Sequence, residues 1–111
     1  KIGILRLLKE YRETGRLKIW EDAWFDQLSR MVGELLGVKS RVDRRVREAG
    51  DYDSLTDSLS GLVREHIPDV SKEVCLAVCQ CLMKEYVLEH QEDLTIYAQW
   101  RESVMRRGGI L

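Results

Sequence analysis

The ten residues from Val74 to Met83 read VCLAVCQCLM, and Gln80 is the only polar residue among them. An amphipathic surface helix shows one apolar stripe, whereas a helix that is apolar on nearly every side must be covered by other elements. The stretch is too short to span a bilayer, which takes about 20 apolar residues. We therefore expect Val74–Met83 to form a central buried helix, around which the other segments pack.

The composition is that of one ordinary globular domain. The chain has 111 residues, of which 44% are hydrophobic and 33% are charged, and its formal net charge is −1. A chain of this length can bury a substantial core, and a balanced charge attracts neither nucleic acid nor membranes over long range. No signal peptide or transmembrane run is visible, and the chain begins at Lys1 without methionine. We expect an intracellular protein of the nucleus or cytoplasm, and a fragment of a longer chain.

Apolar residues recur at helical spacing before this stretch, and strand-like alternation is absent. The second of the helices so predicted is marked by Trp20, Trp24, Leu28, Met31, Val32 and Leu35. The third carries Val38, Val42 and Val46 on one side. Glycine and proline end these helices, and Asp or Ser residues are candidate caps. The first three predicted helices run from Ile4 to Gly15, from Trp20 to Gly37 and from Val38 to Gly50. The fourth runs from an N-cap at Asp53 or Ser54 to Pro68. Asp69 or Ser71 is the predicted N-cap of the central helix that follows.

Helical spacing continues after the buried stretch, from Leu94 to Met105. The polar run Glu89–Asp93 favours a break that makes residues 92–107 a separate C-terminal helix, but one continuous helix stays open. Short links between helices favour antiparallel neighbours. The predicted fold is all-α: residues 1–111 form a single compact bundle of five or six helices.

The sequence shows no catalytic arrangement. Cys75, Cys79 and Cys81 are an odd number of cysteines within seven residues, which indicates a reducing compartment. Cys75 and Cys79 share a helix face, but no second cysteine pair completes a metal site, so we interpret all three as small buried hydrophobes. His66 and His90 are the only histidines, and no phosphate-binding loop or nucleophile motif is present. We predict no catalytic residue, no metal and no cofactor.

A run of basic residues marks the third helix. Five cations fall within nine residues, opposed only by Asp43. Arginine forks suit phosphate groups, so the alternative function is a helical nucleic-acid-binding domain. The simpler interpretation is a solvated face, and the balanced net charge argues against a dedicated DNA-binding protein. The candidate residues are Lys39, Arg41, Arg44, Arg45 and Arg47.

The aromatic residues suggest a different surface. Trp24 and Phe25 are adjacent, so on a helix they point about 100° apart and cannot both face one core wall. Exposed aromatic residues are enriched in protein–protein contacts, although a thick enough fold covers both. Apolar residues exceed what one buried face per helix needs. We predict a non-enzymatic adaptor that clamps a partner helix or self-associates, with no membrane contact. The predicted contact residues are Leu5, Leu8, Trp24, Phe25, Tyr97 and Trp100.

Three short stretches resemble the enhancer-of-yellow-two family, small helical proteins of transcription and mRNA-export complexes. Residues 24–28 (WFDQL) resemble the family's stretch that opens its second major helix, and residues 67–74 (IPDVSKEV) resemble the proline–aspartate start of its last helix. Residues 13–15 (ETG) resemble the end of its first helix. Helix order agrees, and the resemblance covers about residues 4–90.

The resemblance implies a non-enzymatic clamp whose helices wrap a long helix of a partner scaffold protein in nuclear complexes. The chain departs from the family in two places. The interval between Gly15 and Trp24 is shorter than the family's, which implies that one helix is truncated. Residues 91–107 are an addition.

Overall fold

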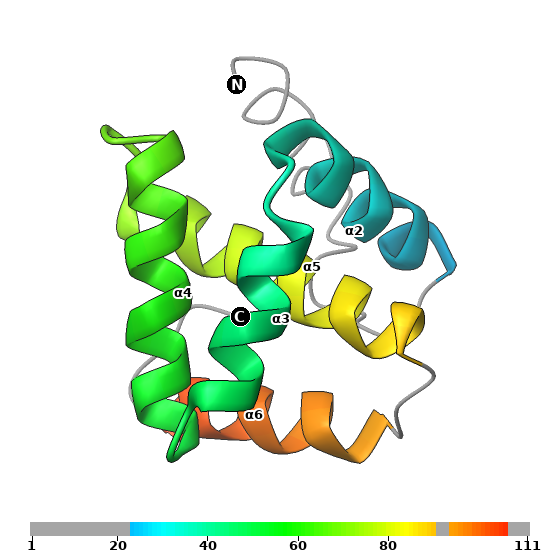
Figure 1. The fold of residues 1–111 in the computed structure, drawn as a ribbon, viewed down its shortest axis with the longest axis vertical. Coiled ribbons are helices and arrows are strands. Elements are labelled where there is room, and N and C mark those ends of the chain that lie inside the picture. The colour runs from blue at the N-terminus through cyan, green and yellow to red at the C-terminus, as the bar shows by residue number, and fades with distance from the viewer. Residues whose placement is uncertain (1–22, 91–93, 107–111) are drawn as a thin grey trace.

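The computed structural model describes residues 23–90 and 94–106, with side chains from 26–90 and 95–106. All regular structure in this part of the chain is α-helical, which confirms the predicted all-α class. Figure 1 shows the arrangement of the helices. In chain order they are α2 (Ala23–Leu36), α3 (Lys39–Glu48), α4 (Tyr52–His66), α5 (Lys72–Glu89) and α6 (Leu94–Arg106).

Helix α5 contains the apolar stretch and touches each of the other described helices, α2 most extensively. Every residue from Cys75 to Met83 is buried, and Val78 is 0% exposed. In Figure 1, α5 crosses the molecule from the side of α4 to the side of α2, with α6 below it. Removing so much apolar surface from water is favourable by about 25 cal/mol per Å². The burial expected for this stretch is therefore observed over nine of its ten residues.

Glycine and proline end α2 and α4 as predicted. Gly37 has φ +66°, a left-handed conformation that glycine adopts without steric cost, and its N–H donates to the Gly33 carbonyl at 2.9 Å. Helix α4 ends at His66, two residues before Pro68. The residue before a proline avoids helical backbone angles, so the helix cannot continue.

The N-cap predicted for α4, at Asp53 or Ser54, is two or three residues too late in the chain. Asp51 is the N-cap, and its Oδ1 accepts a hydrogen bond from the Ser54 N–H at 2.7 Å. Asp53 and Ser54, the predicted caps, lie inside the first turn because the extended backbone of Asp51 already starts the helix. For α5, Ser71 is the cap, one of the two predicted residues, and it accepts from the Val74 N–H at 3.2 Å.

Helix α5 ends at Glu89 and α6 begins at Leu94, and residues 91–93 between them lie outside the described residues. Helix α6 packs against both α4 and α5. Its inner face carries Tyr97, Trp100 and Val104, spaced three and four apart. The indole Nε1 of Trp100 donates to Thr56 Oγ1 on α4 at 3.0 Å. This bond is buried, and side-chain hydrogen bonds from Tyr52 to Gln99 and from Ser103 to Asp53 also join α6 to α4.

The predicted inner side of the third helix is confirmed, since Val38 and Val42 are buried and Val46 packs against the core. The predicted helix from Ile4 to Gly15 lies outside the described residues, as does Trp20. None of the described helices has both the length and the apolar character needed to cross a bilayer.

Candidate functional site

Helix α2 carries two large apolar side chains that the fold leaves about half exposed, at one edge of its core-facing stripe. Met31 is 47% exposed and Leu35 is 56% exposed. They stand four residues apart on one helix, so they share a face one above the other. Met105, near the end of α6, is the third large apolar side chain that the described residues expose, at 43%. We refer to Met31 and Leu35 as the α2 patch.

The apolar stripe of α2 is wide, and the core covers only part of it. Leu28, Val32 and Leu36 are buried, and α2 makes its main contact with α5. Arg30 and Glu34 are exposed beside the α2 patch. An apolar centre with a charged rim is the composition of a protein-binding surface.

A buried charge fixes α2 on α5. Lys84 is 2% exposed, and its Nζ lies 3.4 Å from Asp26 Oδ1 on α2 and 5.4 Å from the centre of the Tyr97 ring on α6. A buried cation is tolerated only when it is paired, and the aromatic face adds a cation–π attraction. Lys84 thereby links three helices.

A second close contact between α2 and α5 joins a glycine to a buried carboxylate. The Glu85 carboxylate fills the space that a Cβ atom at Gly33 would occupy, so any larger residue at Gly33 must displace it. Burial raises the pKa of Glu85; the positive charge of Lys39 opposes this shift, and the nearby carboxylates of Glu89 and Glu34 add to it. The α2 patch therefore lies on a helix held to α5 by specific contacts.

The structure corrects two of the predicted partner-contact residues. Tyr97 and Trp100 are both 0% exposed. Because α6 folds back onto α4 and α5, these rings fill the chain's own core and are not available to a partner. Their 6.0 Å centroid separation is an internal aromatic contact.

The other predicted contact residues are not tested. Leu5 and Leu8 lie outside the described residues, and Trp24 and Phe25 belong to α2 but their side chains are not described. Sequence reasoning placed Met31 and Leu35 among the residues that mark the helix and missed that they face outward. The available signal was that α2 has more apolar residues than one face holds.

Four of the five predicted basic residues meet around one hollow. Its volume is about 480 Å³, and it is lined by Ser40, Arg41, Arg44, Arg45, Arg47 and Glu65. We call it the α3 hollow. Lys39 is not part of it, because its Nζ pairs with Glu89 Oε1 on α5 at 2.9 Å. The arginines that were predicted from the sequence to lie together do so in the structure, whereas Lys39 is separated from them by its ion pair with α5.

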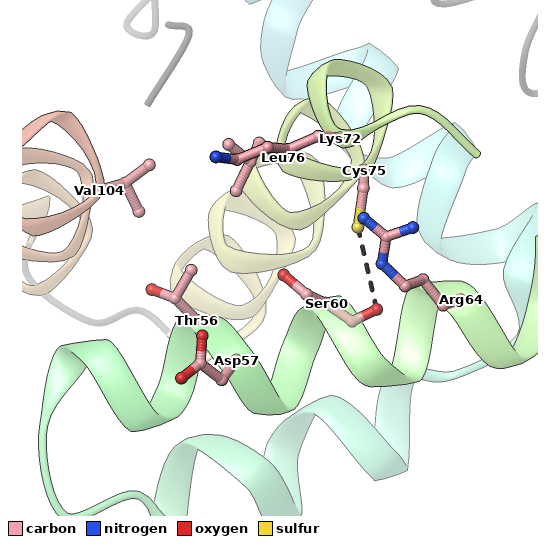
Figure 2. Close-up of a pocket in the computed structure, with 8 residues that line it drawn as sticks. All are labelled: Thr56, Asp57, Ser60, Arg64, Lys72, Cys75, Leu76 and Val104. Carbon is pink, nitrogen blue, oxygen red and sulfur yellow. Dashed lines mark hydrogen bonds between the residues drawn. The ribbon is translucent and has the colours of Figure 1, made fainter. Parts of the chain in front are cut away.

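The cysteines lie beside a smaller cavity of about 240 Å³ between α4 and α5. The Cys75 thiol donates to the Ser60 carbonyl at 3.8 Å, and Arg64 lies beside it (Figure 2). The hydrogen bond with Cys79 lowers the pKa of Cys75 and raises that of Cys79. Burial raises the pKa of Cys81 to about 12. All three thiols are buried, as their interpretation as small hydrophobes requires.

The histidines stand at helix ends. His66 Nδ1 donates to the Leu62 carbonyl at 3.1 Å, and His90 Nδ1 donates to the Tyr86 carbonyl at 3.0 Å. His90 also stacks on the Tyr86 ring. Within the described residues no group of three or more His, Cys, Asp or Glu side chains could hold a metal ion.

Comparison with known proteins adds no relative. No family model matches the sequence, and searches of curated proteins and of solved structures gave no significant match. The class of protein is therefore the one that the fold defines, an all-α domain.

Proposed function

We propose that this chain is a non-enzymatic protein-interaction module that binds an amphipathic helix of a partner protein through the α2 patch. In this proposal the helices form one bundle around α5, which provides a rigid base, and α2 presents the binding surface. The observation that carries the proposal is the exposure of Met31 and Leu35, 47% and 56%, on one helix face.

The chemistry of the α2 patch suits a helical partner. A helix that docks in this way inserts apolar residues spaced three and four apart, the spacing that Met31 and Leu35 themselves have. Methionine adapts its shape to different partners. Fully burying a Met or Leu side chain is favourable by about 1.5–3 kcal/mol, so half-exposed side chains contribute about 1 kcal/mol each. Trp24, seven residues before Met31 in the same helix, is the residue we propose to extend the contact.

The family resemblance supports the same class of function. A clamp around a scaffold helix is what the enhancer-of-yellow-two proteins provide, and the stretch that carries the resemblance, residues 24–28, lies at the start of α2. We extend the proposal on this ground to a subunit of a nuclear transcription or mRNA-export complex. Self-association of two copies through the α2 patch is the other arrangement that the exposed side chains allow.

The test replaces Met31 and Leu35 together by aspartate and measures both the binding of partner proteins and the self-association of the chain. Captures from cells expressing the tagged chain are compared by quantitative mass spectrometry, and purified protein is examined by light scattering. The expected result is at least a tenfold loss of affinity for one specific partner or for a second copy of the chain. The two side chains together contribute about 2 kcal/mol, and a tenfold change in affinity corresponds to about 1.4 kcal/mol.

Met105→Asp is the matched control, because it places the same charge at an exposed methionine on another helix. Both variants should melt as the wild type does, since the replaced side chains are not in the core. The proposal is wrong if the double variant retains every partner that the Met105→Asp variant retains and the wild-type protein is monomeric.

A further inference from the structure

The α3 hollow is a concentrated positive site with little internal neutralisation. Arg41 and Arg47 form no ion pair with any described residue. Arg44 Nε lies 3.9 Å from Glu48 Oε1, with both side chains more than 70% exposed, and such surface pairs contribute little. Glu65 is the one acidic residue among those that line the hollow.

Part of the hollow is held in place from α4. Arg45 Nη1 donates to the Ser58 carbonyl at 3.0 Å and to Ser58 Oγ at 2.9 Å. These bonds reduce the conformational freedom that a ligand would otherwise have to remove from Arg45. The guanidinium of Arg45 is therefore positioned before any ligand arrives.

The start of α3 is a second positive feature at the same place. Val38 precedes the helix and makes no side-chain cap, and no acidic residue lies in the first turn. The N-terminal amides of a helix carry a partial positive charge, which here is compensated neither by a cap nor by a carboxylate. Ser40 belongs to this first turn and lines the hollow. Helix start and arginines together favour an anion.

We propose that the α3 hollow binds consecutive phosphate groups of a nucleic-acid strand, without reading its bases. Arg41 and Arg47 are six residues apart, about 9 Å along a helix that rises ~1.5 Å per residue. One strand of B-form DNA carries a phosphate about every 3.4 Å, so this length faces roughly three phosphates. A single phosphoryl group would contact only part of the length of α3 between Arg41 and Arg47. The residues that line the hollow include no aromatic side chain, so base stacking contributes nothing.

This site is independent of the proposed partner-binding surface. It uses α3 and the end of α4, whereas the α2 patch uses Met31 and Leu35. With a net charge of −1, the protein gains no long-range attraction to a polyanion. The affinity for nucleic acid comes from the hollow alone, and it falls steeply as salt rises.

The experiment measures fluorescence anisotropy of labelled single-stranded and duplex oligonucleotides of two unrelated sequences, from about 50 to about 200 mM salt. The test variant replaces Arg41, Arg44 and Arg47 by alanine and leaves the anchored Arg45 unchanged. The control variant replaces by alanine three exposed cations on other helices, Arg30, Lys72 and Arg106. It therefore changes the net charge by the same amount as the test variant does.

The expected result is binding that is equal for both sequences and is weakened at least tenfold in the test variant. The slope of log affinity against log salt should fall by about two to three, since each lost phosphate contact removes ~0.7–0.9. The control variant should bind within about twofold of the wild type. A lower salt slope shows that phosphate contacts have been lost, whereas a partial folding defect would lower the apparent affinity and leave the slope unchanged. Circular dichroism checks directly that the variant is folded.

Two outcomes overturn the inference. One is the absence of binding to any oligonucleotide at about 50 mM salt, where counterion release favours it. The other is equal binding by the test and control variants. A labelled phosphoserine peptide is titrated in parallel; if it binds the wild type and not the test variant while the oligonucleotides do not bind, the ligand is a phosphoprotein and the nucleic-acid assignment is wrong. These results are independent of whether Met31→Asp/Leu35→Asp loses its partner.

Discussion

At the scale of single residues, Glu85 is a carboxylate whose charge the fold disfavours. Its side chain is 4% exposed, and its carboxylate lies against Gly33 of α2. Burial penalises the charged form and is the main reason that its pKa is raised. In the unfolded chain the same carboxyl has an ordinary pKa near 4.3. The folded protein therefore holds this proton to a higher pH than the unfolded chain does.

This difference predicts a pH-dependent gain in stability for Glu85→Gln. A group with a raised folded-state pKa makes folding less favourable as pH rises from its unfolded value through its folded value. The amide has nearly the same shape and no charge. The variant should melt at a higher temperature than the wild type at pH 8, and the gap should close by about pH 4. Thermal melts at both pH values measure it.

Glu102→Gln is the control: it removes an exposed carboxylate on α6 that takes no part in the shift of Glu85, and the variant should melt as the wild type does at both pH values. A gap between Glu85→Gln and the wild type of equal size at both pH values would contradict the argument. In that case, packing of the amide and not removal of the buried charge would explain the change.

At the scale of elements, α6 packs three inward side chains against the core and forms side-chain hydrogen bonds with α4, among which the Thr56–Trp100 bond is buried. Thr56 Oγ1 donates to the Tyr52 carbonyl at 2.8 Å and accepts from Trp100 Nε1 at 3.0 Å. A buried indole N–H needs a partner. The Thr56 hydroxyl supplies it. Two further bonds join the same helices nearer the surface: Tyr52 Oη donates to Gln99 Oε1 at 2.7 Å, and Ser103 Oγ donates to Asp53 Oδ1 at 3.1 Å.

Thr56→Val should therefore destabilise the protein by about 1–3 kcal/mol, since it leaves the Trp100 N–H buried and unsatisfied. Valine keeps the shape of threonine, so little of the loss comes from packing. Urea denaturation of the variant against the wild type measures the change. In a Trp100→Phe background the same substitution should cost clearly less, because no indole donor remains. Equal costs in the two backgrounds would show that the bond contributes nothing.

At the scale of the whole molecule, the described helices share contact with α5. Helices α2, α3, α4 and α6 all touch it, and Val78 and Leu82 are at most 1% exposed. A charge placed there has no water and no partner. The core is continuous from α2 to α6, so the damage cannot be confined to one helix.

Val78→Asp or Leu82→Asp should abolish cooperative unfolding of the entire chain. Near-ultraviolet circular dichroism should lose its sigmoidal melt, while some helical signal in the far ultraviolet remains. Val74→Asp is the matched control, in the same helix but only partly buried and in its first turn, where a carboxylate favours the helix dipole. A melt of Val78→Asp near that of the wild type would contradict the burial of this segment.

Much of the architecture could be predicted because it depends on neighbouring residues. The apolar run of α5, the stop at Gly37 and the Val38–Val42–Val46 spacing are local patterns, and each corresponds to an observed helix or helix end. The cap of α4 was misplaced because Asp51, Asp53 and Ser54 are all suitable cap residues. Local preference ranks them equally, and only the backbone angles of Asp51 distinguish them.

The candidate sites could be predicted only in part. The arginine run was visible in the sequence, but its division into the α3 hollow and a Lys39–Glu89 pair depends on where α4 and α5 lie. Trp100 and Tyr97 were assigned to a partner surface, yet they are core residues. Met31 and Leu35 show the reverse error, because a wide apolar stripe does not indicate which of its edges is covered.

The sequence by itself determined the all-α class, most helix limits and the burial of residues 75–83, since hydrophobic period, glycine, proline and caps act within a few residues of one another. Only the tertiary structure decided which faces stay in contact with water: one edge of the apolar stripe of α2 and the arginines of α3 are exposed, and the inner face of α6 is covered. Exposure depends on what packs opposite a residue, and those partners lie tens of residues away along the chain.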